Sequence, residues 1–491
     1  MRHCRGNLHG CPERRIENSM SFRLEISTAE FLRIFSQENP SAIISAEIPQ
    51  INKKQKACLN FDSREINKGD IFWALVGKTF NPHKGGIIEE AFKKGAFMAI
   101  VNVAEVEIAK IPLAVATQDT TKALLKFAHG YRKKFANLKV VGITGSAGKT
   151  STKEMIAAVL SHGYNIHVTK GNLNNLFGVP MTLLGLKSKH EAAVIEMGTS
   201  LPGEIRQLTQ AAVPDIAVIT NIAPAHLEGL GSLQGVFEEK KSITEGFEKS
   251  GILVINADDK MLSKIRNTTK YRILTYGVNR GVVKPDEILW DDAGCASFRI
   301  SRTWFKLGMP GLHNLYNALA AIAVGELMRI SKSSIAQALS TVKAYDMRMQ
   351  ILKNNGISVI SDCYNANPHS MEMSLKTLSN MQSSGRKIAV LGDMKELGEH
   401  SAEYHKKIGS MLKELSIDYL IAVGSDAHEY CRGAEESGMK PSRIKYFEDK
   451  KAVADALKFL LRKDDVVLVK ASRSMKLEEV ANNILELEIA K

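Results

Sequence analysis

The amino-acid sequence predicts an α/β fold with three domains: a small α/β N-terminal domain, a central doubly wound domain and a C-terminal Rossmann-like domain. The chain has 491 residues, more than one hydrophobic core usually organises, so several domains are expected. Two long stretches, 111–330 and 331–491, alternate short apolar runs with helical segments. This alternation is typical of a mainly parallel sheet covered by helices.

The N-terminal domain is expected to span residues 21–110. Short apolar runs at 71–75 and 97–101 are typical of strands, and the segment 86–94 between them is typical of a helix. The sequence therefore predicts a small α/β module here.

The two larger domains are expected to repeat one pattern of buried strands and helices. In the central domain we expect strands at 140–144, 193–196, 216–220 and 252–255, and helices at 153–160 and 314–328. In the C-terminal domain we expect strands at 358–360, 388–391, 419–423 and 466–469, and a helix at 452–461. Ligands of such sheets bind beyond the carboxyl ends of the strands, which directs attention to polar residues at those points.

Composition and charge exclude some classes of protein. With 44% hydrophobic and 24% charged residues the chain is typical of a soluble globular protein, and no run approaches the roughly 18 apolar residues of a membrane span. The net charge of +13 suits nucleic acid or a small polyanionic substrate. The lysines are dispersed, as on a solvated surface, so we do not expect nucleic acid to be bound. Six scattered cysteines and the lack of a secretory signal favour the reducing cytoplasm.

Residues 1–20 do not fit the pattern of the domains. They contain His3, Cys4, His9 and Cys11 among several arginines, which could bind a metal, although the spacing matches no standard finger. A transit segment is a second alternative. We expect a disordered tail, or an upstream start with Met20 as the working initiator.

The strongest local signal is a glycine-rich turn between a predicted strand and a predicted helix. Its candidate phosphate-binding residues are Gly145, Ser146, Ala147, Gly148, Lys149, Thr150 and Ser151. Backbone N–H groups in such a turn point at phosphate oxygens, with Lys149 reaching the β/γ-phosphates and the Thr150 hydroxyl ligating Mg²⁺. Ile143 stands where the strict pattern has glycine, so this is a variant of the loop. The central domain is accordingly predicted to be of the P-loop ATPase type.

Other polar residues follow predicted strands. Glu196 ends one strand, where its carboxylate could bind Mg²⁺, and His226 follows another, with a structural role as the alternative. Lys240 and Lys241 lie on the next helix, and local evidence alone favours solvated side chains.

Two more polar clusters are candidates for nucleotide contacts. Asn314 and Asn317 open an alanine-rich helix, where they could cap and pack the helix or bind an adenine edge. The segment 362–368, Asp-Cys-Tyr-Asn-Ala-Asn-Pro, directly follows a strand, and we favour a ligand site there over a simple turn.

Taken together, the sequence resembles the Mur ligases from about Phe61 onward. The segments that carry the resemblance are 62–64, 69–72, 144–150, 171–175, 196–198, 225–229, 362–368, 391–394 and 469–473. No single segment is decisive, but their order and spacing are highly specific. The most discriminating are 362–368 and 391–394.

The resemblance implies an ATP-dependent, amide-forming ligase of peptidoglycan precursor synthesis that uses Mg²⁺. It implies a UDP-substrate-binding domain at 21–110, an ATP-binding domain at 111–330 and a closing domain at 331–491. The expected substrates are UDP-N-acetylmuramoyl-tripeptide and D-alanyl-D-alanine, and the expected state is a monomer. The tripeptide could end in lysine or in diaminopimelate.

The resemblance also implies roles for single residues. Lys149 would be catalytic, and Glu196 and His226 would stand at metal positions together with Thr150. Lys240 matches a lysine that such enzymes carbamylate to form a metal ligand. Nucleotide contacts would come from Asn314, Asn317, Arg348 and Asp362. Substrate contacts would come from Ser63, Arg64, Asn172, Asn174, Asn175 and Asn365.

Two departures from the family pattern and three rivals remain. Asn81-Pro82 replaces the usual acidic-glycine pair before His83, and Ala471 replaces a glycine after Lys470. Rival functions are the ligase that adds the third peptide residue, a folate polyglutamate synthase, and a P-loop motor. The segment 362–368 argues against the first two.

Overall fold

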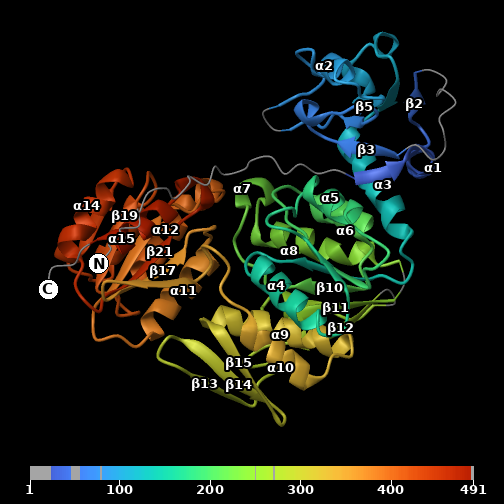
Figure 1. Ribbon diagram of the computed structural model, residues 1–491. Coiled ribbons are helices and arrows are strands. Elements are labelled where there is room, and N and C mark those ends of the chain that lie inside the picture. The colour runs from blue at the N-terminus through green and yellow to red at the C-terminus, as the bar shows by residue number, and fades with distance from the viewer. Residues whose placement is uncertain (1–23, 46–55, 78–79, 249, 269–270, 488–491) are drawn as a thin grey trace, which may run out of the picture. The chain divides into compact units, whose positions relative to one another are not determined.

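The computed structural model describes residues 24–45, 56–77, 80–248, 250–268 and 271–487 (Figure 1). The expectations for residues 1–20 lie outside this part of the chain. The structure divides into two compact units, residues 1–130 and 131–491, and each is described by itself.

The first unit is built on a six-stranded sheet in the order β1-β3-β4-β5-β6-β2. Its central strands are parallel and its two edge strands antiparallel. The strands are β1 (Leu24–Ser27), β2 (Ile43–Ile44), β3 (Lys56–Asn60), β4 (Ile71–Trp73), β5 (Met98–Asn102) and β6 (Ala114–Thr117). The helices are α1 (Thr28–Glu38), α2 (Ile87–Lys93) and the start of α3 (Thr120–Lys133).

An aromatic cluster fills the space between α1, α3 and this sheet. Trp73 is fully buried, its ring centroid 5.6 Å from Phe35 and 5.7 Å from Phe127. Its indole Nε1 donates to Thr120 O at 3.0 Å, which satisfies the one polar atom of the ring. The expected small α/β module is therefore present, with a core of its own.

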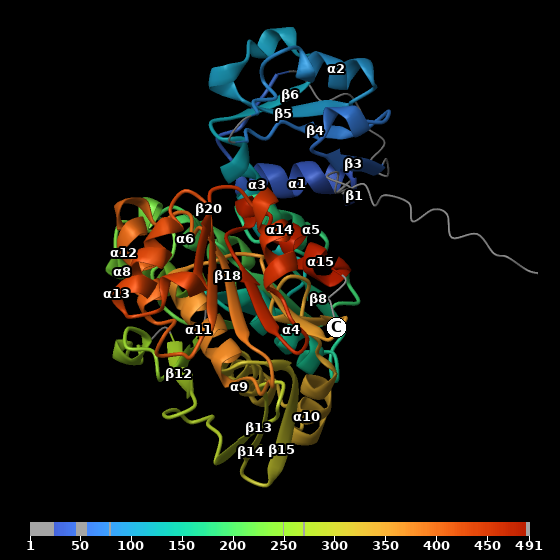
Figure 2. The same ribbon diagram turned by 90° about the vertical axis from the view of Figure 1, so that its left-hand side faces the viewer.

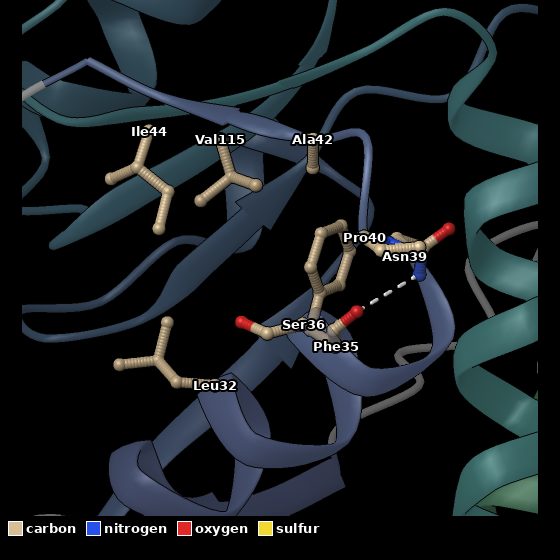
Figure 3. A pocket seen from close by; sticks show the side chains of 8 residues that line it. All are labelled: Leu32, Phe35, Ser36, Asn39, Pro40, Ala42, Ile44 and Val115. Carbon is tan, nitrogen blue, oxygen red and sulfur yellow. Dashed lines mark hydrogen bonds between the residues drawn. The ribbon is translucent and has the colours of Figure 1, made fainter.

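A small hollow opens beside α1 in this unit, next to β2 and β6 (Figure 3). It measures about 130 Å³ and is lined by Leu32, Phe35, Ser36, Asn39, Pro40, Ala42, Ile44 and Val115. Ligand pockets usually measure roughly 300–1,000 Å³, so this hollow is too small for a nucleotide sugar.

The second unit contains the central sheet, which is entirely parallel and has the order β12-β11-β10-β7-β9-β8. Its strands are β7 (Lys139–Thr144), β8 (Ile166–Val168), β9 (Ala192–Glu196), β10 (Ile216–Ile219), β11 (Gly251–Asn256) and β12 (Tyr271–Tyr276). Its helices are α4 (Lys149–Leu160), α5 (Gly178–Leu184), α6 (Glu204–Ala212), α7 (Leu227–Leu230), α8 (Leu233–Lys241), α9 (Leu312–Leu327) and α10 (Lys332–Thr341). In Figure 1, α4 and α9 cover one face of the sheet, and α5, α6 and α8 cover the other. The doubly wound prediction is confirmed.

A three-stranded antiparallel sheet follows the central sheet and was not predicted. It consists of β13 (Glu287–Trp290), β14 (Cys295–Ile300) and β15 (Thr303–Pro310). Its inner face contributes Phe298, Phe305 and Leu307 to the same hydrophobic core as α4 and α9. The sheet therefore extends the core rather than forming a domain of its own.

The C-terminal part of the second unit is a second α/β sheet in the order β16-β17-β21-β18-β19-β20. Only β16 is antiparallel. Its strands are β16 (Gln350–Asn354), β17 (Ile357–Asp362), β18 (Lys387–Gly392), β19 (Tyr419–Val423), β20 (Ile444–Phe447) and β21 (Val466–Lys470). Its helices are α11 (Pro368–Asn380), α12 (Ser401–Ser410), α13 (His428–Glu436), α14 (Lys451–Leu460) and α15 (Glu478–Glu486) (Figure 2).

The three-part α/β architecture expected from the sequence is confirmed, while the domain boundaries 21–110, 111–330 and 331–491 remain predictions. Among the described residues, no helix combines the length and apolar character needed to cross a membrane.

Candidate active site

The glycine-rich loop lies between β7 and α4, as predicted, and two of its glycines are sterically required. Gly148 has φ 78°, and a Cβ there would lie 2.6 Å from Asn317 Oδ1. A Cβ on Gly145 would lie 1.8 Å from Thr220 Oγ1. Both positions therefore exclude any other residue while these neighbours stay in place.

Hydrogen bonds with the segment that follows β10 fix the backbone of the loop. Ser146 Oγ donates to Ala223 O at 2.8 Å, and Asn221 Oδ1 accepts from Ala147 N at 3.0 Å. Thr220 Oγ1 donates to Ala147 O at 2.6 Å. These hydrogen bonds hold the loop in one shape, and such preorganisation is what phosphoryl transfer needs.

Lys149 begins α4 and lies over the loop. Its Nζ donates to Gly145 O at 2.7 Å. Burial lowers the pKa of this lysine, Glu196 opposes that shift, and the positive charge of Arg348 adds to it. The lysine, Glu196 and Arg348 therefore lie close enough to influence one another.

Glu196 ends β9, is 1% exposed and lies beside the first turn of α4. Its Oε1 accepts from Thr150 Oγ1 at 3.1 Å and from Asn174 Nδ2 at 2.8 Å. Its Oε2 is buried and has no hydrogen-bond partner among the described residues. A carboxylate oxygen left unpaired beside a threonine hydroxyl and a phosphate loop fits Mg²⁺, which proteins often bind through one or two carboxylates plus phosphate oxygens.

His226 directly precedes α7 in an unusual backbone conformation, with φ 54°. Its Nδ1 lies 2.6 Å from Glu396 Oε2 and has no hydrogen-bond partner among the described residues. No group of three or more His, Cys, Asp or Glu side chains gathers as a metal site in the described part of the chain. The metal role of His226 therefore stays a prediction.

Lys240 lies near the end of α8 and is 1% exposed, so the local interpretation of a solvated lysine is wrong. Its Nζ makes no hydrogen bond or ion pair with the residues that the structure describes. Burial, and next the charge of Lys149, hold the pKa of Lys240 well below its usual value, against a weaker opposing effect of Glu239. The lowered pKa makes the neutral amine, which is the form that reacts with CO₂, more accessible than in an exposed lysine.

Asn314 and Asn317 lie inside α9, which begins at Leu312 with Gly311 before it, so the capping alternative is wrong. Asn314 Nδ2 donates to Pro310 O at 2.8 Å. Asn317 Nδ2 donates to Asn314 Oδ1 at 3.2 Å, and its Oδ1 accepts from Thr152 Oγ1 at 3.1 Å. In these contacts the two amides join the start of α9 to Thr152 of α4; their contact with adenine stays a prediction.

Asp362 ends β17 and has its carboxylate fully engaged. Its Oδ2 accepts from Lys470 Nζ at 2.6 Å and from Ser374 Oγ at 2.7 Å, and its Oδ1 accepts from Met349 N at 3.2 Å. Arg348 stacks on the Tyr364 ring at 3.8 Å, and its Nε is buried without a partner among the described residues. Arg348 thus has an unused donor for an anion, whereas Asp362 has a structural ion pair.

The segment after β17 reaches the phosphate loop within the second unit. Asn367 caps α11, and its Nδ2 donates to Ser146 O at 3.2 Å. Asn365 Oδ1 accepts from Ala366 N at 2.9 Å, and Asn365 O accepts from Lys470 Nζ. Asn367 is therefore a contact to the loop that the sequence did not single out, although it belongs to the segment 362–368.

The asparagines after β8 divide into different roles. Asn174 binds Glu196, whereas Asn175 Oδ1 accepts from Phe177 N and Gly178 N and so shapes the start of α5. Asn172 O accepts from Asn174 N at 2.8 Å. Of the three, Asn174 lies at the metal candidate.

Ser63 and Arg64 lie in the first unit, in a short 3₁₀ helix. Asp62 and Arg64 form an ion pair of 2.6 Å, and this pair lowers the pKa of Asp62. His83 Nε2 accepts from Asn102 N at 2.9 Å, and its Nδ1 lies 3.0 Å from Asn81 Oδ1, so the unusual Asn81 supports this histidine. The substrate role of Ser63 and Arg64 stays a prediction.

Sequence reasoning missed Lys153, a fully buried lysine on α4. It lies three residues after Thr150, which places the two side chains on one face of the helix. That spacing could have revealed Lys153, had the helix been predicted from Lys149 rather than from Lys153.

Known proteins are similar to this chain in both sequence and fold. Residues 143–325 match the family model of the Mur ligase middle domain, and residues 347–473 match that of the Mur ligase, glutamate ligase domain. The UDP-N-acetylmuramoyl-tripeptide–D-alanyl-D-alanine ligase of Bacillus subtilis is 35% identical over 429 residues, 87% of this chain and 92% of the relative. The ligase of the same name from Haemophilus influenzae is 34% identical, over 93% of this chain and 98% of the relative.

Two solved structures agree with these matches. MurF from Acinetobacter baumannii superposes with a TM-score of 0.84 at 30% identity, over 94% of this chain and 99% of that chain. MurF ligase from Thermotoga maritima in complex with ADP superposes with a TM-score of 0.76 at 29% identity, over 88% of this chain and 96% of that chain.

Proposed function

The chain belongs to the Mur ligase family, and we propose that it joins D-alanyl-D-alanine to UDP-N-acetylmuramoyl-tripeptide with ATP, in the synthesis of peptidoglycan precursors. The observation that carries this proposal is the buried Glu196 carboxylate, which the Thr150 hydroxyl contacts at the foot of the phosphate loop. The names of the relatives support the choice of substrates.

The reaction activates a carboxylate, which is a poor acyl donor because its leaving group would be oxide. ATP transfers its γ-phosphoryl group to the terminal carboxylate of the tripeptide, giving an acyl phosphate and ADP. The amine of D-alanyl-D-alanine attacks the carbonyl carbon, a tetrahedral intermediate forms, and phosphate leaves as the amide bond is made. The amine loses its proton in this step.

The residues of the loop neutralise and orient the crowded anions. The backbone N–H groups at the start of α4, from Gly148 to Thr150, and the ammonium of Lys149 hold the phosphates. Thr150 and Glu196 would hold Mg²⁺, with His226 and a carbamylated Lys240 as further proposed ligands. Bound Mg²⁺ would neutralise charge on the phosphate oxygens as the phosphoryl group moves.

The other site residues position the substrates in this proposal. Arg348 turns its unpaired Nε toward an anion of the nucleotide, and Asn314, Asn317 and Asp362 complete the nucleotide site. Ser63 and Arg64 bind the UDP-linked sugar, and Asn172, Asn174, Asn175 and Asn365 face the peptide. We also propose that the enzyme works as a monomer in the cytoplasm.

Release of phosphate from ATP tests the proposal. It should require both UDP-N-acetylmuramoyl-tripeptide and D-alanyl-D-alanine, and each substrate omitted in turn should return the rate to the background. ATP hydrolysis that nucleic acid stimulates, in the absence of these substrates, would instead support a P-loop motor. Replacing the two substrates by UDP-N-acetylmuramoyl-dipeptide and lysine or diaminopimelate tests the ligase that adds the third residue.

A further inference from the structure

Lys153 occupies a position that is costly for a lysine. Its side chain is 0% exposed, and it lies on α4 one turn after Thr150. A buried ammonium without partners is strongly destabilising, so its surroundings must compensate the charge.

Three oxygen atoms surround the Lys153 ammonium. Thr169 O accepts a hydrogen bond of 2.8 Å, and Glu154 Oε1 lies 2.9 Å away. The third is Glu196 Oε2 at 3.8 Å. This last distance is short enough for strong charge attraction but too long for a hydrogen bond.

Thr169 links the lysine to the same glutamate a second time. Its hydroxyl oxygen accepts from Glu196 N at 3.0 Å, while its carbonyl oxygen accepts from Lys153. Lys153 therefore acts on Glu196 both through space and through the backbone that carries it.

The two oxygens of the Glu196 carboxylate have different surroundings. Oε1 is fixed by hydrogen bonds from Thr150 and Asn174, whereas Oε2 faces Lys153 and accepts none. A hydrogen bond from the lysine would occupy the lone pairs that a cation needs. At 3.8 Å the ammonium balances the negative charge and leaves those lone pairs unoccupied.

We propose that Lys153 is a positioning residue, which balances the charge of Glu196, fixes the direction of its carboxylate and leaves Oε2 open for the divalent cation of the nucleotide. The inference rests on the proposed function, in which Glu196 holds Mg²⁺. Partners that orient a metal ligand in this way are typically worth a factor of about 10–100 in metal affinity.

ADP binding with and without a cation separates this role from a purely structural one. Calorimetry gives the dissociation constant of ADP in the presence of EDTA and in the presence of Mn²⁺. The constant in EDTA divided by the constant in Mn²⁺ measures how much the cation contributes to binding. Lys153→Met should reduce this ratio by at least about tenfold, while the constant in EDTA changes little. Thr169→Val, which removes the hydroxyl acceptor, should reduce the ratio in the same direction.

Glu154→Gln is the matched control, because Glu154 contacts the same ammonium but its contacts do not include Glu196. The ratio for this variant should stay within about twofold of the wild-type ratio, because an ion pair with a partly exposed carboxylate such as Glu154 contributes little free energy. If Lys153→Met does not fold, the ratio of Thr169→Val decides.

Two results overturn the inference, and they are distinguishable. If the wild type binds ADP equally in EDTA and in Mn²⁺, the proposed metal site itself fails. If the wild type binds ADP more tightly in Mn²⁺ but Lys153→Met or Thr169→Val has the same ratio of constants as the wild type, only the role of Lys153 fails. An equal shift of both constants in Lys153→Met leaves the ratio unchanged, so it is one form of this second result, and it indicates a structural role.

Discussion

Lys470 and Asp362 face each other in the register of β21 and β17, and their side chains form an ion pair of 2.6 Å inside the C-terminal sheet. The lysine side chain is 2% exposed and the aspartate side chain 12%. The pair joins two parallel strands at their carboxyl ends, where the segment 362–368 begins.

Removing one partner of this pair should destabilise the fold. In Lys470→Met, Asp362 keeps a buried charge without its cation, and we expect a loss of about 3–5 kcal/mol in the free energy of unfolding, measured by urea denaturation. Lys376→Met is the control, since Lys376 pairs with Glu372 on the exposed face of α11 and should cost under about 0.5 kcal/mol. Equal losses in the two variants would contradict the assignment.

Gly148→Ala should weaken nucleotide binding. The variant combines a left-handed backbone, which costs alanine roughly 1–2 kcal/mol, with a Cβ placed 2.6 Å from Asn317 Oδ1. We expect the dissociation constant of ADP to rise at least about tenfold, as roughly 1.4 kcal/mol corresponds to that factor. Gly231→Ala has a similar φ of 74° but nothing within 4 Å of its Cβ, so it should leave ADP binding intact.

Lys149→Ala should abolish turnover and leave the fold intact, because the ammonium lies over the phosphate loop. The loss of one such donor costs about 100-fold or more in rate. The phosphate-release assay measures it, with circular dichroism as the test of folding. Lys139→Ala, on the exposed start of β7, should keep the wild-type rate. Activity like the wild type in Lys149→Ala would rule out the assigned role of the loop.

Lys240 should form a carbamate. Its lowered pKa favours the neutral amine, which adds CO₂ and releases one proton to give a negatively charged ligand. Enzyme equilibrated with ¹³C-bicarbonate should show a carbamate carbonyl resonance in NMR. The resonance should persist in Lys241→Arg, whose side chain is 40% exposed, and vanish in Lys240→Arg. A resonance retained in Lys240→Arg would place the carbamate elsewhere.

His313 should make stability depend on pH. Burial lowers its pKa to about 4, so the unfolded chain, with a pKa near 6.5, binds the proton more readily. The stability associated with the neutral ring is therefore complete above about pH 6.5 and is lost as the pH falls toward 4, by at most about 3 kcal/mol. Urea denaturation at several pH values should give a shallower slope between pH 4 and 6.5 for His313→Gln than for the wild type. Identical slopes would contradict this account.

The elements that the sequence predicted are those with strong local patterns. The run from Val140 to Thr144 is continuously apolar and leads into glycines, so β7, the loop and α4 follow from neighbouring residues alone. The strands β13 to β15 were missed because their alternation of buried and exposed residues is short and contains a bulge near Cys295. Their burial depends on α9 and α10, which come later in the chain.

The residues of the candidate site also divide into those that the local sequence predicts and those that it does not. Glu196 could be predicted, since it ends an apolar strand beside the loop. The burial of Lys240 and Lys153 could not be predicted from local evidence, because a lysine on a helix is usually solvated and only tertiary packing reveals its burial. The spacing of Lys153 from Thr150 indicates a shared helix face but not that burial. For Lys240 the resemblance to a family supplied what the local pattern lacked.

The position of β21 has a consequence for the order in which the protein can fold during synthesis. Although β21 is the last strand of the chain, it lies between β17 and β18 and pairs with both. A nascent chain that ends before Val466 therefore has two apolar strands with no partner between them, and such edges favour aggregation. The C-terminal sheet can close only after Val466–Lys470 has left the ribosome, so β17 and β18 must wait for a strand that is made about 70 residues or more after them.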